Sequence, residues 1–303
     1  MKNHTQSKIK HSLGERMFIM INAVVFGLFA FICIYPIYYI LINSISANDV
    51  VMRGGVLVLP KGIHFQNFID IFTLKGIAPA TLTSLARTVI GTTTDVLGAM
   101  ILGYAVTKKE YWCRKFWYRF MIVTMYFGAG MIPAYLNIVN LGLLNTFWVY
   151  IIPTLTAPYH MILCKTFVES LPDSLEEAAY MDGAGYFVRF TRVVLPLCKP
   201  IIATCAIYAA VAQWNAYQDT LIYQPKGKYR TLQYILYQYM QNSNAISELI
   251  DSGTIDASAV QAAITPMSLR YTITAVTVIP ILCVYPLFQR HFAKGLMIGA
   301  VKG

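Results

Sequence analysis

Long apolar runs without any charge dominate the pattern of this chain. No Asp, Glu, Lys or Arg occurs from Met17 through Asn48 or from Phe120 through Cys164. A helix that crosses a bilayer needs about 20 consecutive, mostly apolar residues. The first run therefore predicts one span, at about Met17 to Asn43, whereas the second run is too long for a single span. This pattern predicts an all-α membrane protein.

Further apolar segments extend the prediction to six transmembrane helices. Asn and Gly residues between Asn137 and Asn145 indicate a turn inside the second uncharged run. Spans three and four are therefore expected to form a hairpin around this turn. The predicted spans two, five and six lie at about Pro79 to Val106, Pro200 to Gln218 and Tyr271 to Gln289.

Lysine and arginine are distributed unequally between the two sides of this arrangement. Basic residues accumulate in the cytoplasmic segments of membrane proteins. The side that holds both termini carries most of them, which predicts that both termini are cytoplasmic. Residues 1–16 would then form a cytoplasmic N-terminus, followed by a single membrane domain, residues 17–303. The outer side holds two longer loops, Ser44 to Ala78 and Leu221 to Leu269, with few basic residues: Arg53, Lys61, Lys75, Lys226, Lys228 and Arg230.

The composition agrees with a membrane protein and argues against several other classes. Hydrophobic residues make up 57% of the chain and charged residues 13%, whereas soluble domains have roughly a quarter charged residues. The net charge of +10 is explained by orientation in the membrane, so nucleic acid binding is not expected. The first apolar run is too long for the core of a signal peptide. We expect neither disulfides nor a zinc site from the cysteines Cys33, Cys113, Cys164, Cys198, Cys205 and Cys283.

One polar segment, residues 171–200, interrupts the apolar chain between spans four and five. Ser174 and Glu177 have the spacing of a capping box, which predicts that a short helix begins at Leu175. Gly183 suits the left-handed residue that follows a helix, so the helix is expected to end at Asp182. One stripe of this helix would carry mostly small side chains, those of Leu175, Ala178, Ala179 and Asp182.

A second amphipathic helix is predicted after the bend. Its apolar stripe contains Phe187, Phe190 and Val194, and Arg189 and Arg192 lie off this stripe. An amphipathic segment in this place could lie on the lipid headgroups. The small stripe is a poor membrane anchor, however, and anionic lipid would repel the acidic residues. The pattern therefore favours a docking helix for a soluble protein partner.

The spacing within this segment resembles the EAA loop of bacterial ABC importer permeases. The family pattern is EAA, three residues, Gly, nine residues, Ile, one residue and Leu-Pro, and this chain departs from it only by a valine in place of the isoleucine. The resemblance implies that residues 171–197 form a cytoplasmic coupling loop that binds a separate ATPase subunit and transmits its closure to the spans. The matching residues are Glu177, Ala178, Ala179, Gly183, Leu195 and Pro196, and the valine is Val193.

The resemblance covers nearly the whole chain. Six spans with both ends inside are similar to the maltose-type carbohydrate permeases, and residues 14–41 and 285–303 look like the two ends of the LplC-type subgroup. That subgroup usually serves oligosaccharides cut from complex, often acidic, polysaccharides. The implied fold is that of a type I ABC importer permease, with its core at about residues 78–290. The implied ATPase-coupling residues are Leu175, Glu176, Glu177, Ala178, Ala179, Asp182, Gly183 and Ala184.

The same resemblance implies an assembly in the bacterial cell membrane. A second, homologous permease subunit would complete the pathway for the oligosaccharide through the lipid. Two ABC ATPase subunits would bind on the inside, and an extracytoplasmic solute-binding protein would deliver the substrate outside. We expect no metal or cofactor in this chain, because it has no GxxxxGK[ST] phosphate loop and the ATPase partner would bind ATP and Mg²⁺.

Two other functional classes remain as alternatives. A membrane-embedded enzyme is disfavoured, because neither HExxH nor GxSxG occurs in the chain. A stand-alone channel or secondary carrier would work without coupling to ATP. Co-purification of an ATPase with the chain would distinguish an importer subunit from such a carrier.

Polar residues inside the spans are candidates for the substrate pathway. Asp95 in span two is either functional or paired with a polar group from another helix. Arg87, nearer the outer end of the same span, is expected to extend its charged end to the membrane interface. Gln213, Trp214 and Asn215 resemble the Trp-Asn pair in span five of sugar permeases. An indole can stack on a pyranose and amides can bind hydroxyls, but amides also commonly hydrogen-bond between spans.

Overall fold

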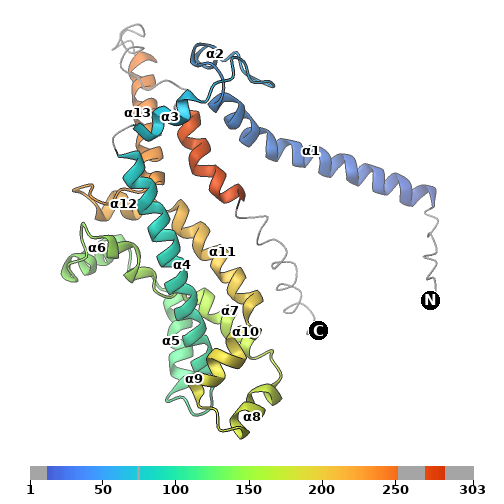
Figure 1. Ribbon diagram of the computed structural model, residues 1–303, viewed down its shortest axis with the longest axis vertical. Helices are drawn as coiled ribbons and strands as arrows, with labels where there is room; N and C mark the ends of the chain where they lie inside the picture. Colours follow the sequence, from blue (N-terminus) through green and yellow to red (C-terminus); the bar gives the residue numbers. More distant parts are fainter. Residues whose placement is uncertain (1–11, 74–75, 252–269, 284–303) are drawn as a thin grey trace. The chain divides into compact units, whose positions relative to one another are not determined.

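The computed structural model describes residues 12–73, 76–251 and 270–283 (Figure 1). Helices form all the regular secondary structure of these residues. The chain divides into two units, Met1–Phe68 with Thr265–Ala275 and Ile69–Ile264 with Val276–Gly303. The N-terminal segment before residue 12, the end of predicted span six and the tail 285–303 lie outside the described residues.

The first unit is built around the long helix α1, Leu13–Ser44, which contains predicted span one. A capping box begins this helix, since the backbone N–H of Glu15 donates to Ser12 Oγ at 3.2 Å and Ser12 N–H donates back to Glu15 Oε2 at 2.8 Å. Nearly all its side chains up to residue 34 are exposed, although the helix is strongly apolar. A bilayer satisfies such a helix, because its apolar side chains then face lipid. The short helix α2, Asn48–Met52, follows.

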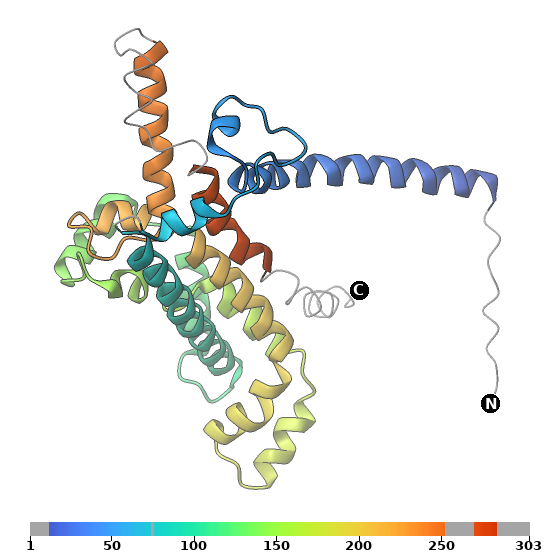
Figure 2. The same ribbon diagram turned by 45° about the horizontal axis from the view of Figure 1, so that its top comes forward.

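The second unit is organised around helix α4, Ile77–Thr107, which contains predicted span two. Helices α7, Pro158–Val168, and α11, Lys199–Asn215, pack along it, and Figures 1 and 2 both show the three side by side. Glycines on α4 permit this close packing. A Cβ added at Gly103 would lie 3.0 Å from the backbone nitrogen of Lys165 on α7.

The second uncharged run is broken more often than the sequence indicates. Helix α5, Arg114–Tyr126, is followed by α6, Met131–Asn140, at an angle of 119°. The predicted turn is present after α6, with Gly142 and Asn145 at positive φ. The break at residues 127–130 was not predicted, and it makes the region of predicted span three two bent helices instead of one. The two glycines in the sequence Phe-Gly-Ala-Gly explain this break, because they allow backbone angles that end a helix.

Only α1 and α4, among the described helices, are long and apolar enough to cross a membrane without a break. Three further pairs of consecutive helices are long and apolar enough to cross a membrane if the two helices of each pair are taken together, although each pair is bent. These pairs are α5 with α6, residues 147–154 with α7 at 44°, and residues 186–197 with α11 at 79°. The helix Arg270–Cys283, in the region of predicted span six, is apolar but shorter.

The two segments predicted as outer loops contain helices as well. The first holds α2 and α3, Gln66–Thr73. The second overlaps α12, Gln218–Tyr223, and holds α13, Leu232–Asp251, before residues 252–269, which lie outside the described part. Hydropathy alone did not indicate these helices, because they are too polar to resemble a span.

Candidate functional site

The predicted docking helix exists as α8, Asp173–Met181, at the end of the second unit farthest from α13 (Figure 1). It begins two residues earlier than the capping box indicates. Pro172 is the N-cap, with an extended backbone, and no side chain caps the helix. Ser174 therefore lies inside the first turn, and the capping box with Glu177 is wrong. Pro172 fits this position before the helix, because its ring disfavours helix in the preceding residue and it has no backbone N–H that a continuing helix could use.

The predicted glycine bend ends α8. Gly183 has φ +80°, the left-handed conformation in which a side chain would be strained. The Gly183 N–H donates to the carbonyl of Tyr180 at 2.9 Å, and the Ala184 N–H donates to the carbonyl of Ala179 at 2.9 Å. These two bonds form a Schellman motif, with Asp182 as the C-cap. The end of the helix is thus fixed by backbone bonds that depend on glycine.

One face of α8 is open in this chain. Met181 is 83% exposed and Leu175 is 44% exposed, and no residue of α8 is buried. An exposed apolar side chain next to acidic residues suits contact with another protein. Among the predicted coupling residues, the exposed ones are Leu175, Glu177, Ala178, Asp182 and Gly183, and the half-buried ones are Glu176, Ala179 and Ala184.

Glu176 points away from this open face and toward the end of α4. Its Oε1 accepts a hydrogen bond from Tyr104 Oη at 2.7 Å, and its Oε2 accepts one from Lys108 Nζ. Arg189 Nη1 lies 3.5 Å from Glu176 Oε1. We call these four residues the Glu176 cluster. The cluster connects α8 to the end of α4 and to the residues that follow the bend.

The carboxyl group of Glu176 is held in its charged form. Burial favours the neutral form, but the hydrogen bonds from Lys108 and Tyr104 and the nearby positive charges of Lys108 and Arg189 outweigh burial. The pKa of Glu176 therefore lies below its ordinary value of 4.5. The stabilisation from pairing of the Glu176 carboxylate is present at a pH above the ordinary pKa. It is lost as the pH falls through the lowered pKa.

This pKa leads to a prediction for acid stability. The difference in melting temperature between the wild-type protein and Glu176→Gln should stay constant from neutral pH down to 4.5, and should shrink only at lower pH. Thermal unfolding in detergent at a series of pH values measures this difference. A difference that already vanishes above 4.5 would mean that the carboxylate is not held by Lys108 and Tyr104.

The chain after the bend differs from the predicted amphipathic helix. Helix α9, Tyr186–Val188, passes into a π-helix, Arg189–Val194, and then into α10, Leu195–Leu197. A π-helix has wider turns than an α-helix, so the faces shift. Arg189, predicted off the apolar stripe, is 9% exposed, whereas Phe187, predicted on it, is 78% exposed. The assignment of the stripe was therefore wrong at these two positions.

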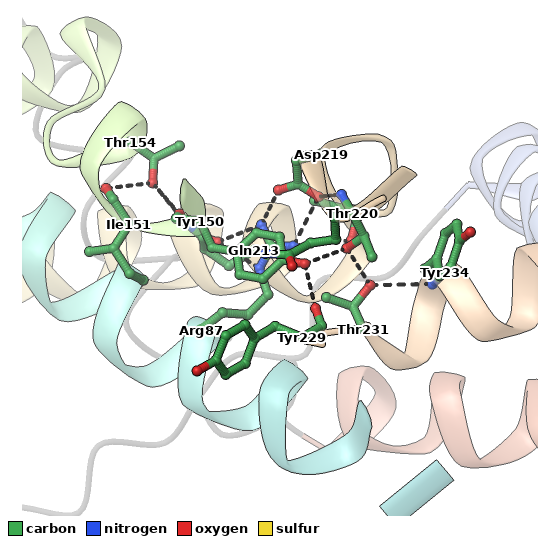
Figure 3. Close-up of polar contacts among 12 residues, drawn as sticks. Arg87, Tyr150, Ile151, Thr154, Gln213, Asp219, Thr220, Tyr229, Thr231 and Tyr234 are labelled. Atoms are coloured by element: carbon green, nitrogen blue, oxygen red, sulfur yellow. Dashed lines mark hydrogen bonds and ion pairs between the residues drawn. The ribbon is translucent and has the colours of Figure 1, made fainter. Parts of the chain in front are cut away.

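A second polar cluster surrounds Arg87 of α4 (Figure 3). Arg87 is 2% exposed, so the expectation that it reaches the membrane interface is wrong. Its Nη1 and Nη2 donate to Asp219 Oδ1 at 3.1 Å and Oδ2 at 2.6 Å. Nε and Nη2 donate to Gln213 Oε1 at 3.1 and 2.9 Å, and Nη1 also donates to the Ala216 carbonyl at 3.3 Å. All five N–H groups of the guanidinium are thereby used.

The Arg87 cluster, as we call these residues together with Tyr150, extends across several helices. The guanidinium lies over the Tyr150 ring at 4.3 Å from its centroid. Tyr150 Oη donates to the Tyr229 carbonyl at 2.5 Å and lies 3.0 Å from Thr220 Oγ1. Gln213 Nε2 donates to Thr154 Oγ1 at 2.9 Å. The cluster thus connects α4 to the end of α11, to α12 and to the residues after α6.

Asp95, the other charged residue of span two, is also paired. Its Oδ1 accepts a hydrogen bond from the backbone N–H of Ala157, and its Oδ2 accepts one from His160 Nδ1, both at 2.6 Å. The N–H of Ala157 is at the start of α7, where a negative charge is stabilised by the helix dipole. Of the two interpretations of Asp95, the structure shows the pairing with another helix.

The polar residues of span five make contacts within the protein. Trp214 Nε1 donates to the Thr277 carbonyl at 2.9 Å, and Trp214 is 7% exposed. Asn215 Oδ1 accepts a hydrogen bond from Gln233 Nε2 at 3.1 Å, and Asn215 is half-buried. These contacts, with those of Gln213, show hydrogen bonds between helices at all three positions.

Several partners in these clusters were not singled out from the sequence. Lys108, Arg189, Asp219 and His160 each pair with an opposite charge or a carboxylate. A signal for Asp219 was available, because a buried charge must be paired and Arg87 needs an acid. Asp219 was the obvious candidate, because it is the acidic residue that directly follows predicted span five. In the structure, α11 ends at Asn215 and α12 begins at Gln218, so Ala216 and Tyr217 separate the two helices.

Comparison with known proteins places the chain in a family. Residues 10–298 match the family model described as "Binding-protein-dependent transport system inner membrane component". "Protein LplC" of Bacillus subtilis is 32% identical over 301 residues, which cover 99% of each chain. The "Polygalacturonan/rhamnogalacturonan transport system permease protein YtcP" of the same organism is 31% identical, over 96% of this chain and all of YtcP.

A solved structure agrees with this match. It is one chain of a bacterial ABC transporter involved in the import of the acidic polysaccharide alginate. The TM-score is 0.82 and the identity 29%, over 94% of this chain and 100% of the other. A stand-alone channel or a secondary carrier is not compatible with such relatives. The chain therefore belongs to the family of binding-protein-dependent transport system inner membrane components, the permease subunits of ABC importers, which leave ATP hydrolysis to a separate subunit.

Proposed function

We propose that this permease transports acidic oligosaccharides derived from complex polysaccharides. The observation that carries the proposal is the similarity over the whole chain to proteins named for such substrates. YtcP is named for polygalacturonan and rhamnogalacturonan, and the solved structure for alginate. All three polysaccharides carry carboxylates on their sugars. The relative from Thermococcus litoralis named for trehalose and maltose is less similar, at 27% identity.

We further propose the topology and the partners of the assembled importer. Six spans, with a core at about residues 78–290, would place both termini in the cytoplasm. A second, homologous permease, two ABC ATPase subunits and an extracytoplasmic solute-binding protein would complete it. The contact between Lys108 and Glu176 supports this topology, since it joins the basic end of span two to the polar segment 171–197.

The open face of α8 is the surface proposed to bind the ATPase subunit, which would hold ATP and Mg²⁺. Glu177, Ala178 and Met181 are exposed there, while the Schellman motif fixes the orientation of the helix end. Small side chains let a partner approach the helix backbone closely. The acidic residues would pair with basic groups of the partner.

We propose Asn215 as the residue of the predicted substrate pathway best suited to contact a sugar. Asp95, Gln213 and Trp214 are buried and occupied by contacts between helices. Asn215 is only half-buried, and its amide nitrogen donates to no group in the described part of the chain. A sugar hydroxyl could accept that hydrogen bond.

Docking of α8 is tested by cross-linking in the assembled complex. A cysteine at Ala178 should cross-link to the ATPase subunit, because that side chain is exposed on the open face. Glu177→Lys should lower substrate-stimulated ATP hydrolysis by roughly tenfold, as it reverses a charge at the contact. Glu169→Lys, at an exposed position outside α8, is the matched control and should leave hydrolysis unchanged. A cysteine at Ala178 that never reaches the ATPase would refute the docking.

The substrate class is tested separately by competition. Proteoliposomes with the full complex and its binding protein should take up oligogalacturonates or alginate oligosaccharides. Neutral maltooligosaccharides of the same length should compete poorly. Preference for the neutral sugars would refute the acidic substrate and leave the permease assignment intact.

A further inference from the structure

Two neighbouring acids of α8 point in different directions. Successive side chains on a helix are about 100° apart, so Glu176 and Glu177 cannot face the same surface. Glu177 is exposed, whereas the side chain of Glu176 is 19% exposed and bonded to Tyr104 and Lys108 of the α4 end. The two acids therefore have separate roles, and only Glu177 is free to meet a partner.

The Glu176 cluster places Arg189 beside the carboxylate as a second cation. Arg189 Nη1 is within ion-pair distance at 3.5 Å, which is too long for a strong hydrogen bond. Arg189 Nε is buried and has no hydrogen-bond partner within the described residues. The guanidinium of Arg189 therefore keeps one donor unused next to the carboxylate that already pairs with α4.

Helix α4 extends from this cluster to the Arg87 cluster. The distance along the helix from Lys108 to Arg87 is about 30 Å, at 1.5 Å per residue. The helix is continuous from Ile77 to Thr107, with its single proline in the first turn. It packs on α7 and α11 along this length. A displacement at one end is therefore transmitted to the other without a hinge within the helix.

We infer that Glu176 is a positioning residue for transport, which couples movement of α8 to α4 and, through α4, to the Arg87 cluster at the far end. This inference rests on the proposed docking of α8 to the ATPase. Closure of the ATPase subunits moves α8, and the bonds from Glu176 to Lys108 and Tyr104 pull the end of α4 with it. The polar contacts of Arg87 with α12 then change on the opposite side of the membrane.

The experiment uses the full complex and separates docking from transmission. Glu176→Gln and Lys108→Met should each lower the stimulation of ATP hydrolysis by substrate roughly tenfold. The double variant should be no worse than either single one, because both remove the same interaction. Lys165→Met with Glu169→Gln removes a comparable ion pair of 2.7 Å outside the cluster, and should have no effect.

A label at the far end of α4 provides the readout that a merely structural role would not change. Gln218, an exposed residue at the start of α12, is replaced by cysteine after the exposed native cysteines are replaced by serine. Its rate of reaction with a maleimide should depend on ATP in the otherwise unaltered complex. Glu176→Gln should abolish this dependence while the cross-link from position 178 to the ATPase persists.

Each remaining outcome decides a different point. If Glu176→Gln still cross-links from position 178 and keeps normal stimulation and ATP-dependent labelling, Glu176 does not transmit the movement, and the docking of α8 stands. If the cross-link is absent even without substitution at Glu176, the proposed docking itself fails. Effects of Glu176→Gln and Lys108→Met that multiply in the double variant would show that the two residues act separately, which also overturns the inference.

Discussion

Asp219→Ala should destabilise the protein by about 3–5 kcal/mol, because it leaves a buried guanidinium without its carboxylate. Arg87 is 2% exposed and uses two of its N–H groups on Asp219. In this variant the acceptors that remain for the guanidinium are Gln213 Oε1 and the Ala216 carbonyl. The free energy of unfolding, measured by titration with a denaturing detergent, should fall accordingly, and uptake should be lost with it.

A second substitution tests whether the unpaired charge of Arg87 causes the loss of stability in Asp219→Ala. Arg87→Met combined with Asp219→Ala removes the charge itself, so the double variant should be no less stable than Asp219→Ala. Glu169→Ala, which breaks the more exposed pair with Lys165, should cost less than about 1 kcal/mol. Equal losses in Asp219→Ala and Glu169→Ala would contradict the interpretation of Arg87 as a buried, fully paired cation.

Gly98→Ala should also be strongly destabilising, despite adding a single methyl group. Its Cβ would lie 2.0 Å from Thr156 Oγ1 and 2.8 Å from the backbone carbonyl of Leu155. A backbone oxygen cannot rotate away, so α4 and the start of α7 must separate. The adjacent bond from Ala157 N–H to Asp95 would lengthen as a result. Overpacking of this kind costs roughly 1–3 kcal/mol, and the disrupted Asp95 contacts place this case at the upper end.

Gly27→Ala is the matched control for this substitution. Gly27 lies inside helix α1, and an added Cβ there would meet nothing within 4 Å. Alanine is favoured over glycine in a helix by about 1 kcal/mol, so this variant should be at least as stable as the wild-type protein. Apparent melting temperatures of the two variants in the same detergent provide the comparison. A similar temperature for both would show that α4 and α7 are not closely packed at Gly98.

The sequence was most informative where a local signal sufficed. The uncharged first run and the second span predicted the positions of α1 and α4 to within a few residues. Glycine at 183 predicted the left-handed bend, because few other residues adopt that conformation without strain. The spacing of the EAA pattern indicated the family, which the comparisons confirm.

The sequence was least informative where partners are distant along the chain. Arg87 and Asp219 are 132 residues apart, and nothing in hydropathy indicates which acid the arginine of a predicted span will meet. The π-helix was missed for a related reason. Its wider turn depends on packing against the neighbouring elements, while the pattern of apolar residues presumes α-helical spacing. Arg189 was consequently assigned to the wrong face, and the complete Glu176 cluster was seen only in the structure.

The hydrogen bond between Trp214 and the Thr277 carbonyl has a practical consequence for spectroscopy. The other tryptophans, Trp112, Trp117 and Trp148, are 75%, 37% and 54% exposed, whereas Trp214 is 7% exposed. Replacement of those three by phenylalanine would leave Trp214, at the end of α11, as the single tryptophan of this chain. Its emission wavelength would report, without any added dye, whether that indole stays dry while the importer turns over.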